Sequence, residues 1–203
     1  MRVCRLGRRR RVLLFRGCSG GRTVLGGVFL GVRVSIGLFF CRIAVIEAIE
    51  SVQQNVTESL TENQTYGGAS QPGYFYAVVD DGSGNPPSNF LASVFNAVDA
   101  VRPIGSVFGI FPPVEVTANI GMTLTTAAGY DHTTLVTAVQ NAITAFVNAL
   151  NVGDDLPYSR LAQIAYTTSP GITNVTGVLL NSGTSDLVTT SQQVIKVGTL
   201  TII

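Results

Sequence analysis

Apolar and polar residues alternate over 114–124 in the pattern of a β-strand with one buried face. One side of this strand is predicted to carry Val114, Val116, Ala118 and Ile120. Over 131–150, apolar residues recur instead with the period of an α-helix, in the stripe Leu135, Val139, Ile143, Phe146 and Leu150. Burial of five such side chains contributes on the order of 7–15 kcal/mol before entropy, so we expect this helix to lie on a sheet.

Shorter patterns predict further elements on both sides of this pair. Before it, we expect a helix over 43–56, a polar loop over 57–73, a strand over 74–81, a helix over 90–102 and a strand over 106–113. After it, we expect a short helix over 159–166 and strands over 172–181 and 194–202. The predicted inner face of the first helix consists of Ile43, Ile46, Ile49 and Val52.

The helix over 90–102 has recognisable signals at both ends. Ser88 or Asn89 is a candidate N-cap, because a short polar side chain can accept a hydrogen bond from a free amide of the first turn. Arg102 and Pro103 end the helix, since proline cannot continue it. Its buried side is predicted to contain Phe90, Leu91, Val94, Phe95, Val98 and Val101.

The order of these elements predicts an α+β fold of two consecutive small units, each with helices packed on an antiparallel or mixed sheet. The first unit spans 43–113 and the second 114–203. Residues 1–42 form a separate segment, with ten of the thirteen basic residues, all three cysteines and no acidic residue. The remainder carries three basic residues against all twelve acidic ones. Two compositions this different seldom belong to one domain.

Three interpretations of the segment 1–42 remain open. A basic start followed by an apolar run over 24–46 is typical of a membrane-directed segment, although Arg33 and Arg42 interrupt the run and a charge at mid-membrane costs roughly 2.5–3.5 kcal/mol. The four arginines at 8–11 suit a basic arm that contacts phosphates. A wrong start or a shifted reading frame is the third interpretation, because a GC-rich gene read out of frame tends to give Arg, Gly, Cys, Leu and Val without acids.

Neither the cysteines nor the overall composition selects among these interpretations. Cys4, Cys18 and Cys41 lack a CxxC spacing and paired histidines, so they form neither a zinc site nor a disulfide framework. The whole chain is 46% hydrophobic and only 12% charged, where a soluble domain usually has roughly 25% charged residues. Such a surface suits a protein that stays packed against neighbours.

The one histidine of the chain, His132, is the first candidate for catalysis. A catalytic interpretation pairs it with Asp131 and with Thr133 as a nucleophile. Neighbours in sequence on a helix cannot adopt the geometry of a catalytic triad. We therefore favour the interpretation in which Asp131 caps the helix over 131–150 and His132 is solvated.

Two pairs of adjacent carboxylates, Asp80-Asp81 and Asp154-Asp155, are candidate metal ligands. The segment DDGSGN at 80–85 has the spacing of a calcium loop but lacks its closing bidentate Glu. A turn and a helix start explain both pairs, and the glycines at 17–31 match no phosphate-binding pattern. The sequence therefore indicates no cofactor and no metal, and it predicts a protein that is not an enzyme.

Several segments, in their order and spacing over about 43–203, resemble the baseplate J-like protein family. They are AIE at 48–50, PGYFYAVVDDG at 72–82, RPIG at 102–105, a strand after Pro113, VGDDLPYSRL at 152–161 and PGITNVTGVLL at 170–180. The positions that carry the family pattern are Arg102, Pro103, Gly105, Gly153, Asp154, Leu156, Ser159 and Leu161. The resemblance implies a structural role for these residues and no catalytic ones.

Members of that family form wedge components of contractile phage tails and related injection machines. The resemblance implies a structural component of a phage-type tail baseplate that mediates subunit–subunit assembly. Expected partners are other baseplate wedge proteins and copies of this chain, with no nucleic acid and, for 43–203, no membrane. The expected location is the tail baseplate of a virion assembled in the bacterial cytoplasm.

Two alternatives to this function are a membrane-anchored binding module that uses residues 24–46 and a hydrolase. The family normally has a larger, β-rich portion before the AIE helix, and residues 1–42 match nothing in it. The resemblance therefore also predicts a truncated or frame-shifted prophage product.

Overall fold

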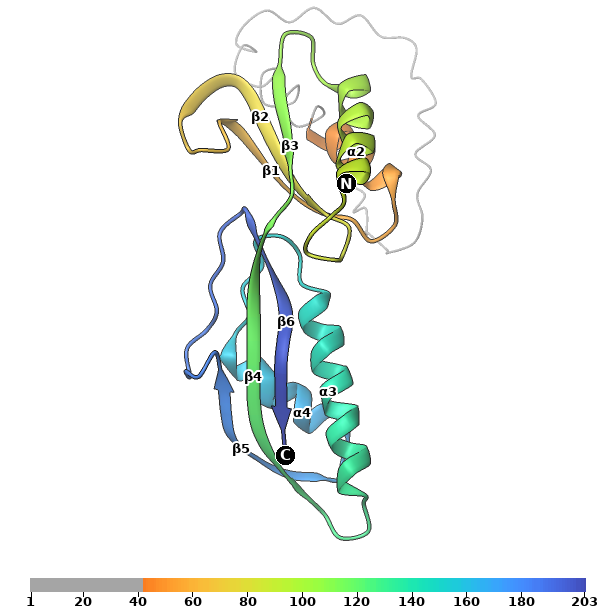
Figure 1. The fold of residues 1–203 in the computed structure, drawn as a ribbon, viewed down its shortest axis with the longest axis vertical. Helices are drawn as coiled ribbons and strands as arrows, with labels where there is room; N and C mark the ends of the chain where they lie inside the picture. Colours follow the sequence, from red (N-terminus) through yellow and green to blue (C-terminus); the bar gives the residue numbers. More distant parts are fainter. Residues whose placement is uncertain (1–41) are drawn as a thin grey trace, which may run out of the picture.

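The computed structural model describes residues 42–203. The interpretations of residues 1–41, including most of the apolar run over 24–46, lie outside the described residues. Two units follow each other along the long axis of the molecule (Figure 1). The described residues form four helices and six strands in two three-stranded mixed sheets. The predicted α+β fold of two consecutive units is confirmed.

The sheet of the first unit has the strand order β1–β2–β3, with β1 (Thr57–Gln64), β2 (Ser70–Asp80) and β3 (Val107–Phe111). β1 runs antiparallel to β2, and β3 runs parallel to it. A parallel connection needs a crossover, and α2 (Ser88–Val101) supplies it. The first helix, residues 42–52, and α2 pack on the same face of this sheet.

The side-chain alternation of β2 separates two buried clusters on the two faces of the first sheet. The face toward the helices packs Phe75, Ala77 and Val79 against Val45, Ile49, Phe90, Val94 and Val98. The opposite face carries Tyr76 and Val78, with Tyr66, Tyr74 and Phe111 around them. The second half of β2, from Phe75 to Asp80, is therefore buried on both sides, which explains its nearly continuous apolar sequence.

Two sequence-based predictions for the start of the first unit were wrong. Of the predicted inner face of the first helix, Ile49 is buried as expected, whereas Ile43 is 37% exposed and the unpredicted Val45 is buried in its place. β1 lies inside 57–73, which the sequence indicated as a loop. Leu60 is its one large apolar residue, so no alternation marks this strand. The strand forms because its backbone pairs with β2, from Thr57 opposite Asp80 onward.

The prediction for α2 was correct in its extent and wrong in two details. The N-cap position is Pro87, without a side-chain cap, in place of Ser88 or Asn89. Phe95 and Val101 are 43% and 42% exposed, so only part of the predicted buried side is covered. Arg102 ends the helix as expected, with its amide bonded to the Val98 carbonyl.

The sheet of the second unit has the order β5–β4–β6, with β4 (Val114–Thr126), β5 (Ile172–Leu180) and β6 (Gln193–Ile202). β5 is antiparallel to β4, and β6 is parallel to it. Two helices, α3 (His132–Asn148) and α4 (Tyr158–Thr168), connect β4 to β5 and pack on this sheet. β4 buries Ala118 and Ile120 as predicted, whereas Val114 is 51% exposed.

The long helix α3 has the amphipathic character that the sequence predicts. Its buried residues are Leu135, Val139, Ile143 and Val147. Phe146 and Leu150 of the predicted stripe also pack against this core, but they are only partly buried at its border. Asp131 is the N-cap, and its carboxylate accepts hydrogen bonds from the Thr134 amide (2.8 Å) and hydroxyl (2.5 Å). The predicted cap is confirmed.

Candidate functional site

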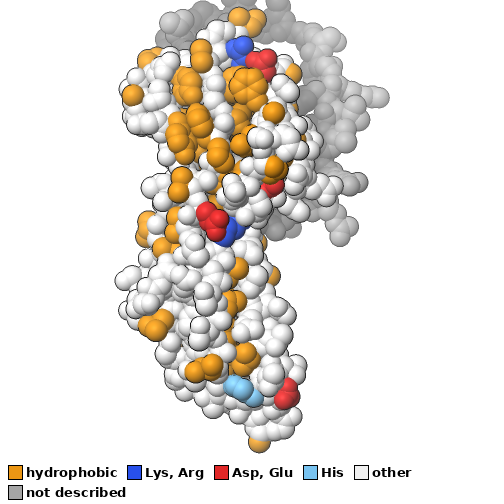
Figure 2. Space-filling model, viewed as in Figure 1, with side chains coloured by type: hydrophobic (Ala, Val, Ile, Leu, Met, Phe, Trp, Pro, Cys, Tyr) orange, Lys and Arg blue, Asp and Glu red, His pale blue; other side chains and the backbone are white. Residues whose placement is uncertain are grey.

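An exposed apolar surface covers the outer side of α2 and β3 in the first unit. Figure 2 shows hydrophobic side chains gathered on this end of the molecule. Its most exposed members are Ile104 (106%), Val107 (58%) and Phe95 (43%). We call these three residues, together with Val101, the α2–β3 surface. Contiguous exposed apolar side chains are typical of a contact surface for another molecule.

Three stacked aromatic rings connect this surface to the core of the first unit. The rings of Phe75 and Phe108 lie 5.4 Å apart, and those of Phe108 and Phe95 lie 4.6 Å apart. Phe75 is buried in the core, whereas Phe95 is exposed. The stack therefore continues the core outward to the solvent and holds Phe95 in a fixed position.

The turn between α2 and β3 holds Ile104 at its tip, and Arg102 is the residue that fixes this turn. The Arg102 Nε donates to Asp99 Oδ1 at 2.6 Å, and Nη1 donates to the Ser106 carbonyl at 2.6 Å. Its guanidinium also lies 5.7 Å from the centre of the Phe108 ring. Gly105 has a φ of 86°, a backbone conformation in which a residue with a side chain would be strained. Of the family-pattern residues, Arg102, Pro103 and Gly105 thus shape this turn.

The other five family-pattern residues lie in the second unit, in and around the link from α3 to α4. Gly153 has a φ of 85°, and its amide donates to the Gln193 carbonyl at 2.8 Å. The Asp154 carboxylate accepts from the Asn151 amide at 2.9 Å. Leu156 and Leu161 are fully buried, and Ser159 is exposed on α4. These contacts position the link between α3 and α4. The eight family-pattern residues therefore lie in two separate places and do not form one site.

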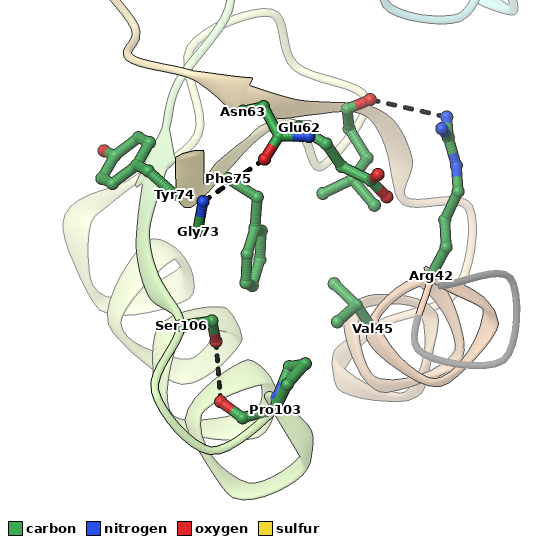
Figure 3. Close-up of a pocket in the computed structure, with 10 residues that line it drawn as sticks. Arg42, Val45, Glu62, Asn63, Gly73, Tyr74, Phe75, Pro103 and Ser106 are labelled. Atoms are coloured by element: carbon green, nitrogen blue, oxygen red, sulfur yellow. Dashed lines mark hydrogen bonds between the residues drawn. The ribbon is translucent and has the colours of Figure 1, made fainter. Parts of the chain in front are cut away.

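A small cavity lies between the start of the first helix, β1, β2 and the turn after α2 (Figure 3). Its walls include Val45, Leu60 and Phe75, and Pro103 closes one side. Its volume is about 110 Å³, whereas sites for cofactors and drug-sized ligands usually have roughly 300–1,000 Å³. The cavity is therefore too small for a cofactor.

The junction between the two units contains a buried ion pair that the sequence did not indicate. Lys196 Nζ of β6 lies 2.9 Å from Asp80 Oδ2 at the end of β2, and both side chains are at least nine-tenths buried. Among residues 42–203, these are the two charged residues in the buried class. They are separated by more than a hundred residues, so no local pattern could have paired them.

Around the ion pair, the junction combines apolar and polar contacts. Tyr76 and Val78 of the first unit pack against Val152 and Val194 of the second. The side-chain amide of Gln192 donates to the Tyr66 carbonyl at 2.8 Å and to the Tyr76 hydroxyl at 3.1 Å. The two units therefore have a defined mutual orientation.

The residues considered for catalysis or metal binding form structural contacts instead. Asp80 pairs with Lys196, and Asp81 accepts from the amide and hydroxyl of Ser83 in a turn. Asp155 accepts from the Thr189 amide at 2.7 Å. Within the described range 42–203, no group of three or more His, Cys, Asp or Glu side chains could hold a metal ion.

His132 is exposed, as expected, and its Nδ1 lies 2.7 Å from the Thr126 hydroxyl. The Asp131 carboxylate is bonded to Thr134, and these hydrogen bonds lower the pKa of Asp131. Asp131 is therefore engaged as a helix cap, and it does not orient His132 toward Thr133 as a triad would require. Among the helices of residues 42–203, none is long and apolar enough to span a membrane.

Comparison with known families connects the second unit to baseplate proteins. Residues 118–203 match the family model described as the Baseplate J-like protein C-terminal domain. The resemblance to the baseplate J-like family that the sequence predicts is therefore confirmed for this part of the chain. The match covers β4 through β6 and includes the link between α3 and α4.

Among solved structures, one similar chain belongs to the cryo-EM structure of the anti-feeding prophage baseplate, symmetrised 6-fold. The two chains are 15% identical with a TM-score of 0.43, and the similarity covers 61% of this chain and 29% of the other. This chain thus spans less than a third of the length of that baseplate chain. No curated protein matches the chain.

Proposed function

We propose that the protein is a structural component of a phage-type contractile tail baseplate and that it holds neighbouring subunits together. The observation that carries this proposal is the family match over residues 118–203. The proposed role needs no catalytic group, and the contacts of His132 and of the paired carboxylates agree with it because each side chain is engaged in a structural contact. The proposed partners are other baseplate wedge proteins and further copies of this chain, in a tail baseplate assembled in the bacterial cytoplasm.

The α2–β3 surface is the first proposed contact with a neighbouring subunit. Lasting interfaces have an apolar centre, and this surface combines Ile104 with the rigidly stacked Phe95. Burial of an exposed isoleucine side chain contributes up to about 1.5–3 kcal/mol. Because Arg102 is already paired with Asp99 inside the first unit, a partner would not have to compensate an unpaired charge here.

The outer edge of the second unit, formed by β5 and the adjoining side of α4, is the second proposed contact. Tyr166 on α4 is 45% exposed, and Leu179, on the face of β5 that points away from the helices, is 43% exposed. The Tyr166 hydroxyl accepts from the Val175 amide at 3.0 Å and lies 3.2 Å from Asn174 Oδ1, so the exposed ring is fixed against β5. β5 is also an outer strand of its sheet, and an outer strand can pair with a neighbouring chain.

The two contacts can be tested by complementing a tail-defective phage with variants of the chain and counting contractile particles by microscopy. Ile104→Asp and Leu179→Asp each place a charge on one proposed contact without disturbing a buried residue. Both are expected to reduce the particle count by about tenfold or more, because a buried unpaired charge strongly disfavours association. Asn141→Asp, on the exposed side of α3, is the matched control.

His132→Ala supplies the second control, because the structural role does not require the imidazole. We expect normal particle numbers for Asn141→Asp and His132→Ala. Loss of particles with a stably folded His132→Ala variant would contradict a purely structural role. Normal particles with both Ile104→Asp and Leu179→Asp would show that neither surface is an assembly contact.

A further inference from the structure

One short covalent link and one small set of contacts join the two units. Among residues 42–203, the chain passes between the sheets once, through Pro112-Pro113 from the end of β3 to the start of β4. Two consecutive prolines favour an extended and stiff connection. All other restraint on the orientation comes from the Asp80–Lys196 pair and the contacts around it.

The ion pair is built into the ends of both sheets. Asp80 Oδ1 accepts from the Gly84 amide at 2.8 Å, and Lys196 Nζ donates to the Gly82 carbonyl at 2.9 Å. A Cβ on Gly84 would lie 2.9 Å from Lys196 Cγ, so the glycine leaves room for the lysine stem. The turn after β2 is therefore shaped to receive a side chain from the other unit.

The pair adds little net stability but strongly selects one orientation. Burial of two charges costs free energy that their attraction roughly offsets, whereas one of them buried alone is strongly unfavourable. In the structure, the junction between the two units buries both charges, and each compensates the other. An intermediate orientation, with the charges buried but apart, is therefore disfavoured, and the junction has discrete positions.

An alternative partner for Lys196 lies in its own unit. Glu115 is on β4, next to β6, and its Oε2 would be 3.5 Å from a Cβ placed on Gly84, close to the Lys196 stem. If the first unit moved away with Asp80, Lys196 could pair with Glu115 while both became exposed. The charge of Lys196 would then be paired in this second orientation of the units as well.

A cavity beside the ion pair provides a path for water. Its volume is about 360 Å³, and its lining includes Thr57 and Asp80 of the first unit and Asn148, Asn151 and Lys196 of the second. The Thr57 hydroxyl is buried and has no hydrogen-bonding partner among the protein atoms of residues 42–203. A cavity of this size with polar side chains in its wall has room for several water molecules, which can hydrate the charges when they separate.

We propose that the junction is a latch with two positions. In the closed position, Asp80 pairs with Lys196 and fixes the angle between the units. In the open position, Lys196 pairs with Glu115, and the units are separated at this contact while Pro112-Pro113 still joins them. This inference concerns the conformation of the isolated chain and does not depend on the proposed baseplate role.

The test is a distance measurement between spin labels by pulsed electron paramagnetic resonance on the full chain. The labels are placed at Asn96→Cys on α2 and Ala145→Cys on α3, two exposed positions in different units. The three native cysteines are replaced by serine. With Asp80 and Lys196 intact, one narrow distance distribution is expected. A broad distribution in this reference protein would overturn the latch.

The Asp80→Asn variant removes one charge of the pair with little change in shape. It is expected to increase the population at a second distance about tenfold, and adding Glu115→Gln is expected to reduce that population. Asp99→Asn is the matched control, because it breaks the exposed ion pair with Arg102 inside the first unit, and it should leave the distribution unchanged.

A folded Asp80→Asn variant with one unchanged narrow distance would overturn the proposal. If circular dichroism shows that this variant is unfolded, the double variant Asp80→Asn with Lys196→Met replaces it, because it buries no unpaired charge. Because Lys196 can no longer pair with Glu115, the latch predicts one narrow distance in the double variant. A second distance there would show that the Lys196–Glu115 pair does not define the open position and would overturn the proposal.

Discussion

The two units share a sheet design but differ in how their exposed apolar residues are connected to the core. In each, a central strand runs antiparallel to one neighbour and parallel to the other, and helices pack on the sheet. The second unit encloses one extended core between its sheet and both helices. The first unit instead continues its aromatic core outward to Phe95 and leaves Ile104 fully exposed. The exposed ring of Phe95 is thus continuous with the core of the first unit, whereas exposed apolar residues of the second unit, such as Leu179 and Val188, lie outside its core.

The largest expected difference between the units is the effect of removing an apolar side chain from corresponding helices. Ile143 on α3 is fully buried, so Ile143→Ala is expected to lower the free energy of unfolding by about 2–5 kcal/mol. Phe95 on α2 is 43% exposed, and Phe95→Ala should cost no more than about 1.5 kcal/mol, mainly through its stack with Phe108. Urea denaturation of the two variants measures both values, and similar losses at the two positions would contradict the comparison.

A smaller loss is expected for Phe146, at the border of the second core. Full burial would predict a loss of about 3–5 kcal/mol for Phe146→Ala, but the ring is partly exposed, with the Arg160 guanidinium 5.6 Å from its centre. We therefore expect about 1.5–3 kcal/mol by urea denaturation. Thr144→Ala is the control, with a change within about 0.5 kcal/mol, because the Thr144 hydroxyl only bonds back to the Gln140 carbonyl of the same helix. Equal losses at both positions would show that the assigned helix face is wrong.

The first unit is also expected to respond to pH through Glu58 on β1. Burial, and then the nearby charge of Glu50, raises the pKa of Glu58 from 4.5 to about 7. Because the folded state binds this proton more tightly than the unfolded state, the protein should gain stability as pH falls from about 7 toward 4.5. Since the side chain is only half buried, the gain is limited to roughly 1 kcal/mol after solvent screening.

Urea denaturation at pH 7.5 and pH 5.5 checks this expectation, and Glu58→Gln should remove most of the difference. The exposed Glu62, on the same strand, provides the matched control as Glu62→Gln. The pH dependence of stability that Asp131 contributes has the opposite sign, because its pKa is lowered. Its stabilising contribution is lost only as pH falls below 3.8, outside this window. An unchanged pH dependence in Glu58→Gln would exclude Glu58 as the cause.

The smallest effect on stability is expected from removing residues 1–42. If this segment is foreign to the fold, a shortened chain that begins at Ile43 should fold and dissolve at least as well as the full chain. It would lose ten arginines and all three cysteines. Circular dichroism and solubility decide the matter. Aggregation of the shortened chain alone would show that the segment belongs to the core.

The comparison also explains which parts of the fold could be predicted from the sequence. The helix α3 and the strand β4 carry their own periodic patterns, because each buries one face against its own unit. β1 has one large apolar residue, Leu60, so its strand is determined by pairing with β2 and has no local signal. Phe95 and Val101 follow the helical stripe of α2 yet are exposed. Their exposure was not predictable, because a sequence pattern cannot distinguish the buried part of an apolar stripe from an exposed part.

The features of the candidate site can also be divided into those that the sequence predicts and those that it does not. The cap at Asp131 follows from residue spacing and was predictable. The Asp80–Lys196 pair depends on how two units meet, and Asp80 alone has the signature of a turn. The exposure of Ile104 depends on the turn that Arg102 and Gly105 fix. Contacts between distant segments were therefore the part that the sequence could not reveal.

The most direct test of the proposed role is to locate the chain in contractile tail particles. A phage-producing strain that expresses the full chain with a small epitope tag would be induced, and the tails would be purified and labelled with antibody-coated gold. The account predicts gold at the baseplate end of the tails, at several copies per particle, and the tagged chain in the purified fraction. Tails that assemble normally and carry no tagged chain, or that carry it along the tube only, would contradict a structural role in the baseplate.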